Sequence, residues 1–243
     1  MPLLCVKNNN ERINNMKKIG FIGVYDKTDL VLVISELLVK SGRKVLFIDA
    51  TKDEKAKYIV PSIIPTVSYI TSFEDIDVAI GFENFTQVKQ YVCADDENEM
   101  EYDYVFIDTD DIEKIKMFEL TSSDQLYYVT SFSGYSLRKG IEILRKVDLP
   151  LRMTRVFFTK EMLKEEDDYF DYLTLDLKIK WNDNKIYFLL ENGDLSAIME
   201  NNRLQCIKLR NLSIEYKENI IYMASQICPE VNERFYRKIV KDM

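Results

Sequence analysis

The feature that most constrains the fold is a pair of short apolar segments separated by one segment of helical length. The apolar segments are "KKIGFIGV" (17–24) and "KVLFIDAT" (44–51), each suited to one buried strand. Between them, "LVLVISELLVKSG" (30–42) has the length of a helix, and Gly42 closes it. Two strands joined through a helix over so short a distance form a βαβ unit, so the sequence predicts a parallel sheet.

The same alternation continues along the chain. Because strand-like and helix-like segments follow one another, the sequence predicts an α/β fold that is doubly wound, with a mainly parallel sheet and helices on both faces. The further strand candidates lie at 75–82, 102–111, 125–132 and 152–159, and the further helix candidates at 85–92 and 136–147.

One region departs from this alternation. From Leu173 to Trp181 apolar residues recur at every second position, and "NDN" (182–184) then precedes another apolar segment. This pattern favours an antiparallel hairpin over 172–190.

The predicted domain organisation has three parts. Residues 1–15 are asparagine-rich and aperiodic, which indicates a flexible N-terminal leader, so we expect the folded domain to span 16–228. Residues 229–243 are predicted as a C-terminal amphipathic helix, and the acidic segment 94–100 as a solvated loop.

Composition excludes several classes of function. The chain has no histidine, which removes imidazole bases, His-based triads and His-containing zinc sites. The four cysteines have no metal-ligand or redox spacing. A net charge of −8 disfavours non-specific nucleic-acid binding, so no nucleic-acid partner is expected. No apolar run approaches the roughly 18 residues of a membrane span, so we expect a cytoplasmic protein.

The segment "FIGVYDKTD" (21–29) has the outline of a phosphate-binding loop in which most glycines are replaced. It carries the pair Lys27 and Thr28, and Asp49 and Asp108 end two other predicted strands. The carboxyl ends of parallel strands meet at one edge of a sheet, where nucleotides bind in such folds. The alternative is structural: a Lys-Thr pair after a strand is commonly a helix start, and an acid at a strand end commonly caps the next helix.

These segments together resemble the MinD/ParA family of deviant Walker ATPases. That family reads strand, KGGxGK[TS]T, helix, glycine, and a strand ending in Asp, as 17–51 does in outline, and "YDYVFIDT" (102–109) is similar to its Walker B strand. The likeness spans nearly all of 17–227 and implies a P-loop NTPase-like fold.

The resemblance also implies roles for five residues. Lys27 would hold phosphate, Thr28 would bind Mg²⁺, and Gly23 would be the remaining loop glycine. Asp49 would be the acid that ends the second strand, and Asp108 the Walker B acid. The cofactor expectation is ATP with Mg²⁺, weakly bound, or no cofactor at all; no residue is assigned a catalytic role.

The departures from the family pattern argue against an efficient ATPase. Ile22 stands where the signature lysine would reach across a dimer, and Thr51 where the second switch acid would help to activate water. Val24 and Asp26 replace loop glycines. A carboxylate such as Asp26 about 4 Å from a phosphate oxygen costs roughly 4 kcal/mol at an effective dielectric of about 20, or close to a thousandfold in affinity.

Within the family, the residues favour the positioning branch. Paired cysteines for iron–sulfur chemistry and a C-terminal tyrosine cluster of autokinases are both lacking in the sequence. MinD-like regulators and the CpaE/TadZ group of Flp pilus assembly proteins remain, and the latter group has atypical Walker A loops. The interpretation is therefore a degenerate, dimeric localisation or assembly scaffold. The alternatives are a slow but genuine ATPase and a pure interaction module.

The resemblance implies two kinds of partner. A homodimer would form through the face carrying 23–28 and 109–136, and a membrane-associated machine would supply protein partners. The tail 229–243 could contact the inner face of the membrane, with an apolar stripe on one side and basic residues on the other. The alternative is that this helix packs on the domain's own core.

Overall fold

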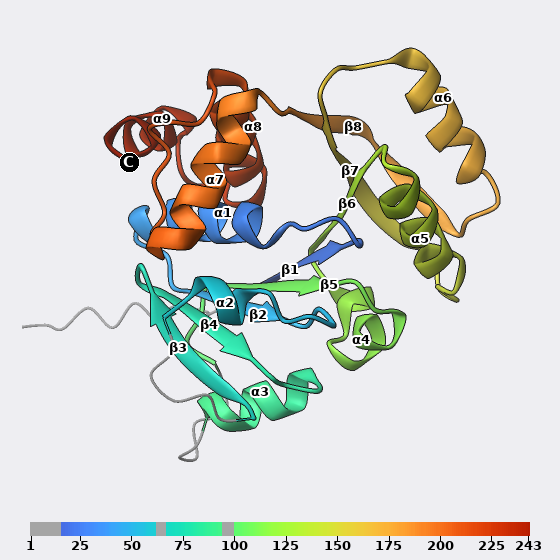
Figure 1. The fold of residues 1–243 in the computed structure, drawn as a ribbon. Helices are drawn as coiled ribbons and strands as arrows, with labels where there is room; N and C mark the ends of the chain where they lie inside the picture. Colours follow the sequence, from blue (N-terminus) through green and yellow to red (C-terminus); the bar gives the residue numbers. More distant parts are fainter. Residues whose placement is uncertain (1–15, 62–66, 94–99) are drawn as a thin grey trace, which may run out of the picture.

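The computed structural model describes residues 16–61, 67–93 and 100–243. One eight-stranded sheet runs through these residues in the order β3-β4-β2-β5-β1-β6-β7-β8 (Figure 1). All neighbouring strands are parallel except β3, which pairs antiparallel with β4. The strands are β1 (Lys17–Ile22), β2 (Val45–Asp49), β3 (Tyr69–Phe73), β4 (Ile76–Ile80), β5 (Tyr104–Thr109), β6 (Gln125–Ser131), β7 (Leu151–Thr159) and β8 (Ile179–Leu189).

Helices cover both faces of this sheet, and the prediction of a doubly wound α/β fold is confirmed. One face packs against α1, α2, α7, α8 and α9, and the other against α3, α4, α5 and α6. The helices are α1 (Thr28–Lys40), α2 (Ala56–Ile59), α3 (Phe85–Val92), α4 (Ile112–Met117), α5 (Gly134–Arg145), α6 (Lys164–Leu173), α7 (Asn192–Leu204), α8 (Ile214–Ile227) and α9 (Glu233–Asp242).

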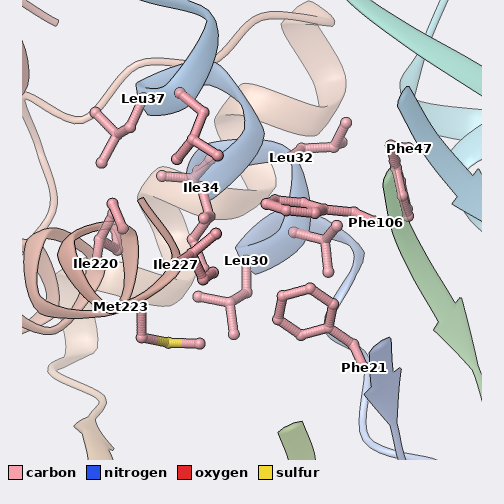
Figure 2. Close-up of a cluster of buried hydrophobic side chains, with 14 of the residues drawn as sticks. Phe21, Leu30, Leu32, Ile34, Leu37, Phe47, Phe106, Ile220, Met223 and Ile227 are labelled. Carbon is pink, nitrogen blue, oxygen red and sulfur yellow. The ribbon is translucent and has the colours of Figure 1, made fainter. Parts of the chain in front are cut away.

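The central strands read as continuous apolar runs because both of their sides are buried. In β1, Phe21 faces the α1 side of the sheet, whereas Ile22 faces the α5 side. Figure 2 shows Leu30 of α1 lying between Phe21 and Met223 of α8. Helix α1 is therefore enclosed between the sheet and α8.

The predicted antiparallel hairpin over 172–190 is wrong. Residues up to Leu173 belong to α6, and β8 is one continuous strand that runs parallel to β7. The register passes from Met153↔Trp181 to Arg155↔Lys185, so the three residues of "NDN" oppose Thr154 alone. The turn-forming residues therefore build a bulge within a strand rather than a chain reversal.

The described residues contain one hairpin, and the sequence did not predict it. It joins β3 to β4 through Glu74 and Asp75, which both have left-handed backbone angles. Two such residues suit a tight hairpin turn, but they are usually Asn or Gly, and the sequence offers neither here.

The C-terminal helix packs on the domain, which is the alternative that the sequence left open. Helix α9 contacts α8 and α1, and it buries Tyr236 and Val240. It begins at Glu233, where the Asn232 side chain accepts a hydrogen bond from the Arg234 N–H, and not at 229 as predicted. The predicted leader 1–15 and most of the acidic loop 94–100 lie outside the described residues. In the described part of the chain, no helix is long and apolar enough to span a membrane.

Candidate nucleotide site at the carboxyl edge of the sheet

A cavity of about 160 Å³ lies where β1, β2 and β5 end. The loop between β1 and α1 forms one wall, and the segments after β2 and β5 form the others. Its lining comprises Gly23, Val24, Tyr25, Asp26, Lys27, Thr28, Thr51, Asp53, Lys55, Asp108, Asp110 and Tyr135. Four of the five predicted site residues therefore meet here, and Asp49 lies outside the lining.

Lys27 is held inside the protein by two close contacts. Its Nζ lies 2.6 Å from Oδ1 of Asp108 and donates a hydrogen bond of 2.6 Å to the carbonyl of Gly23. The side chains of Lys27 and Asp108 are 2% and 0% exposed, so the ion pair is shielded from water. The lysine at the phosphate position is thus neutralised by its own chain.

Burial governs the charge state of Asp108. It raises the pKa of this carboxyl well above its ordinary value, and the Lys27 ammonium opposes the change. Among the described residues, Oδ2 of Asp108 has no hydrogen-bond partner. Asp108 and Thr28 both line the cavity, and a carboxylate with an unpaired oxygen together with a hydroxyl is a donor set that suits Mg²⁺, which takes oxygen ligands and keeps several waters.

The cavity fits the phosphate end of a ligand rather than a whole nucleotide. Pockets for drug-sized ligands usually have roughly 300 Å³ or more. Lys27 would hold a phosphate group, and Thr28 and Asp108 would hold a magnesium ion.

Asp49 has a different task from the one that the sequence suggested. It pairs in register with Asp108 across β2 and β5, but its oxygens turn to the following loop. Oδ1 accepts hydrogen bonds from the backbone and hydroxyl of Thr51, at 3.0 and 2.6 Å, and Oδ2 accepts one from the Ala56 N–H at 2.8 Å. Burial raises the pKa of Asp49, and these hydrogen bonds oppose the change. Asp49 therefore shapes the loop that leads into α2.

Asp26 should repel phosphate less strongly than its position in the sequence indicated. Its Oδ1 accepts a hydrogen bond of 3.3 Å from the Thr28 N–H at the start of α1, and its Oδ2 lies 3.0 Å from Nζ of Lys55. The carboxylate is thus paired, and the repulsion calculated for a bare charge is an overestimate. Sequence reasoning missed Lys55, because it lies 29 positions away in a segment without a motif.

The two departures that bear on hydrolysis are also visible. Ile22 is fully buried in β1, so its side chain belongs to the core and not to the cavity. Thr51 donates its hydroxyl to Asp49 and accepts a hydrogen bond from the Glu54 N–H. Neither position supplies a charge to the cavity.

Aromatic residues border the cavity as well. Tyr25 stacks on Phe158, with ring centroids 4.7 Å apart. Burial, with help from Asp26 and Asp29, raises the pKa of Tyr25 to about 12, so its hydroxyl stays protonated. Tyr135 is 73% exposed at the start of α5 and stands on the rim.

A larger cavity of about 640 Å³ lies elsewhere in the protein, at the amino ends of β6 and β7. Arg152 and the bulge residues of β8 line it, and it contains none of the predicted site residues.

Comparisons with known proteins identify the fold. No protein-family model and no curated protein matches the sequence. A ParA family ATPase from Chlorobium tepidum TLS is similar in structure, with a TM-score of 0.59 at 13% identity over 87% of this chain and 98% of that chain. A chain of the MinC:MinD cell division protein complex from Aquifex aeolicus gives 0.56 at 15% identity, over 89% and 97%. A complex of a McdA variant with ATP, from Cyanothece, gives 0.54 at 14% identity, over 88% and 96%. The chain shares the fold of ParA and MinD ATPases over nearly the full length of these relatives.

Proposed function

We propose that the protein is a degenerate MinD/ParA-like protein of the CpaE/TadZ type, which acts as a dimeric localisation or assembly scaffold. The observation that carries this proposal is the buried ion pair between Lys27 and Asp108. In a nucleotide-dependent switch, the phosphate lysine must be available to its ligand. Here an internal carboxylate satisfies it, so the loop keeps its shape without ATP.

Weak or absent hydrolysis follows from what the cavity lacks. Phosphoryl transfer depends on cations and water-positioning groups placed around the transferred phosphate. Ile22 is a core residue and the Thr51 hydroxyl is occupied by Asp49, so two such groups are missing from the described site. ATP with Mg²⁺ is retained in the proposal as a weakly bound ligand, since one solved relative of this fold is an ATP complex.

The proposed partners are a second copy of the chain and the proteins of a membrane-associated machine, pilus assembly or a related secretion system. The dimer face would carry 23–28 and 109–136, where the exposed Tyr135 gives an apolar contact. Ile22 replaces the lysine that would reach across the dimer to the partner's nucleotide, so the dimer would not depend on ATP. Cytoplasmic location, a peripheral contact of 229–243 with the membrane, and the lack of a nucleic-acid partner stay predictions.

The first test is a Mg²⁺-dependent ATP hydrolysis assay. Wild-type turnover is expected below roughly 1 per second, against a median enzyme value near 10. Lys27→Ala and Thr28→Ala serve as matched variants; the second leaves no buried charge unpaired and so guards against misfolding. Robust Mg²⁺-dependent hydrolysis that both substitutions abolish would overturn the proposal of weak or absent hydrolysis and favour the alternative, a genuine ATPase that positions a cellular structure.

The second test is light scattering at tens of micromolar protein, with and without ATP. The expected result is a dimer in both conditions, the commonest closed assembly. A monomer in both conditions would overturn the dimeric scaffold. A dimer without any detectable nucleotide binding would favour the remaining alternative, a pure interaction module.

A further inference from the structure

We infer that Lys55 is a second phosphate-binding lysine of the cavity, supplied by the same chain from the loop after β2. The inference rests on the proposed function, because it concerns the weak nucleotide site. It assigns phosphate binding to the loop after β2, which lies outside the Walker motifs. The ligand class is the phosphate end of a nucleoside di- or triphosphate, or pyrophosphate, with Mg²⁺.

The position of Lys55 carries the inference. Its side chain lines the same cavity as Lys27 and Thr28, and its Nζ lies 3.0 Å from Oδ2 of Asp26. The two partners of this pair are 41% and 49% exposed, unlike the sealed pair of Lys27 and Asp108. An exposed pair exchanges its partners at little cost.

The loop is built to hold Lys55 in this place. Asp49 accepts hydrogen bonds from Thr51 and from the Ala56 N–H, directly after Lys55. Thr51 in turn accepts a hydrogen bond of 3.1 Å from the Glu54 N–H, and Glu54 has a left-handed φ of 47°. A non-glycine residue in that conformation persists where its surroundings fix it, so the loop is constrained and not merely extended.

The charges of the cavity call for such a cation. The ammonium of Lys27 is already matched by Asp108, and the other carboxylates of the lining belong to Asp26, Asp53 and Asp110. A phosphate group that enters meets an acidic wall, and Lys55 is the remaining lysine among the described lining residues. Charge-assisted hydrogen bonds to phosphate are stronger than neutral ones.

The inferred event is an exchange of partners. Phosphate takes the ammonium of Lys55 from Asp26, while Asp26 keeps its hydrogen bond to the Thr28 N–H at the start of α1. Mg²⁺ offsets the carboxylate that this leaves uncompensated. Asp26 thereby acts as an internal competitor of the ligand, which accounts for low affinity without a loss of the site.

The test is titration calorimetry with Mg²⁺–ATP and Mg²⁺–pyrophosphate as separate probes. The variants are Lys55→Gln, Asp26→Asn, the double variant, and the control Lys57→Gln. Lys57 lies two residues away outside the lining, and its Nζ is 3.5 Å from Glu54, so its removal reports the change in net charge alone. Binding to both probes supports recognition of the phosphates, whereas binding to ATP alone would overturn the pyrophosphate part of the ligand class.

The expected result is that Lys55→Gln weakens binding about tenfold, while Lys57→Gln leaves it unchanged. Asp26→Asn is expected to tighten binding. In the Asp26→Asn background, Lys55→Gln must still weaken binding about tenfold, because a direct contact does not need Asp26.

Two outcomes overturn the inference alone. If Lys55→Gln binds as the wild type does, Lys55 does not contact the ligand. If its effect disappears in the Asp26→Asn background, Lys55 merely neutralises Asp26. Lack of binding of both probes to the wild type at about 10 mM would overturn both the inference and the ATP component of the proposed function, whereas the light-scattering test of the dimer stands apart from all of these results.

Discussion

The cavity of the candidate nucleotide site and the β7–β8 edge of the sheet both contain ion pairs beside parallel strands. The ion pair at the cavity is buried, whereas those at the edge are partly exposed. At the cavity, Lys27 and Asp108 are almost wholly shielded. At the edge, Arg155 pairs with Asp171, which is 49% exposed, and Lys185 lies 3.1 Å from Asp167 and 3.5 Å from Asp171.

This difference separates a constrained site from an adaptable one. A buried pair with one partner removed leaves a charge without solvent, whereas water and neighbouring groups replace a lost partner at the surface. At the edge, Arg155 also donates a hydrogen bond to the Asn182 carbonyl and lies over the Trp181 ring. The cavity should therefore be sensitive to single substitutions, and the edge tolerant of them.

The largest effect is expected for Lys27→Met. It leaves Asp108 buried without its partner, so the free energy of unfolding should fall by about 3 kcal/mol in urea titrations at neutral pH. The matched double variant Lys27→Met with Asp108→Leu should regain most of that loss, because it removes both charges. A loss below about 1 kcal/mol for the single variant would place the cavity in the same class as the edge.

The second largest effect is a dependence of the free energy of unfolding on pH, which is caused by Asp29 in the first turn of α1. Burial, followed by the charge of Asp26, raises the pKa of Asp29 to about 7. The folded state thus binds the proton of the Asp29 carboxyl group more tightly than the unfolded chain does. The contribution of this group to the free energy of unfolding is therefore complete below about pH 4 and is lost as the pH rises to about 7. In Asp29→Asn, the fall in the free energy of unfolding over this window should be smaller by about 2 kcal/mol, roughly half of what the full rise in pKa would give, because the side chain is partly exposed to solvent. If the free energy of unfolding depends on pH equally in the wild type and in Asp29→Asn, Asp29 is not the group responsible.

At the edge, Asn182→Ala should cost about 1 kcal/mol of unfolding free energy. The side chain accepts a hydrogen bond of 2.7 Å from Nε of Arg152 and donates one of 2.8 Å to the Thr154 hydroxyl, which ties the bulge to β7. Asn184→Ala is the control, since the Asn184 amide donates to the Tyr222 hydroxyl rather than to β7, and it should cost less. A loss of several kcal/mol for Asn182→Ala would show that the bulge is as constrained as the cavity.

The smallest effect is expected for Asp171→Asn. The carboxylate is half exposed and Arg155 keeps its other contacts, so the loss should be about 0.5 kcal/mol. Salt near 1 M should erase the difference from the wild type in thermal melts, because it screens exposed charges. A salt-independent loss would mean that this pair behaves as a buried one.

Most of the sheet could be predicted because its central strands are buried on both faces and read as unbroken apolar runs. Prediction failed where one local signal had two structural uses. The "NDN" segment is equally suited to a turn and to a bulge, and parallel pairing with β7 on both sides of it decides for the bulge. Helix α9 begins at Glu233 and not at 229 as predicted, because the capping side chain of Asn232 is the stronger local signal.

Only those residues of the site that belong to a sequence motif or end a predicted strand could be predicted. Lys27, Thr28 and Asp108 follow from the loop and the strand ends, and the structure brings them to one cavity. Asp49 shares their edge of the sheet but not their cavity, since its hydrogen bonds depend on a loop that the sequence leaves undefined. Lys55 depends on the same loop, so no pattern of spacing could have found it.

Gly23 bears on how such a loop changes over evolutionary time. Its φ is 144°, and a Cβ at this position would lie 2.0 Å from the carbonyl oxygen of Val129. Selection for folding alone would therefore preserve glycine at this position, whether or not the loop binds a ligand. Among relatives of this chain, we expect glycine at 23 to persist even where Thr28 and Lys55 differ, so a conserved glycine at this position is by itself no sign of nucleotide binding.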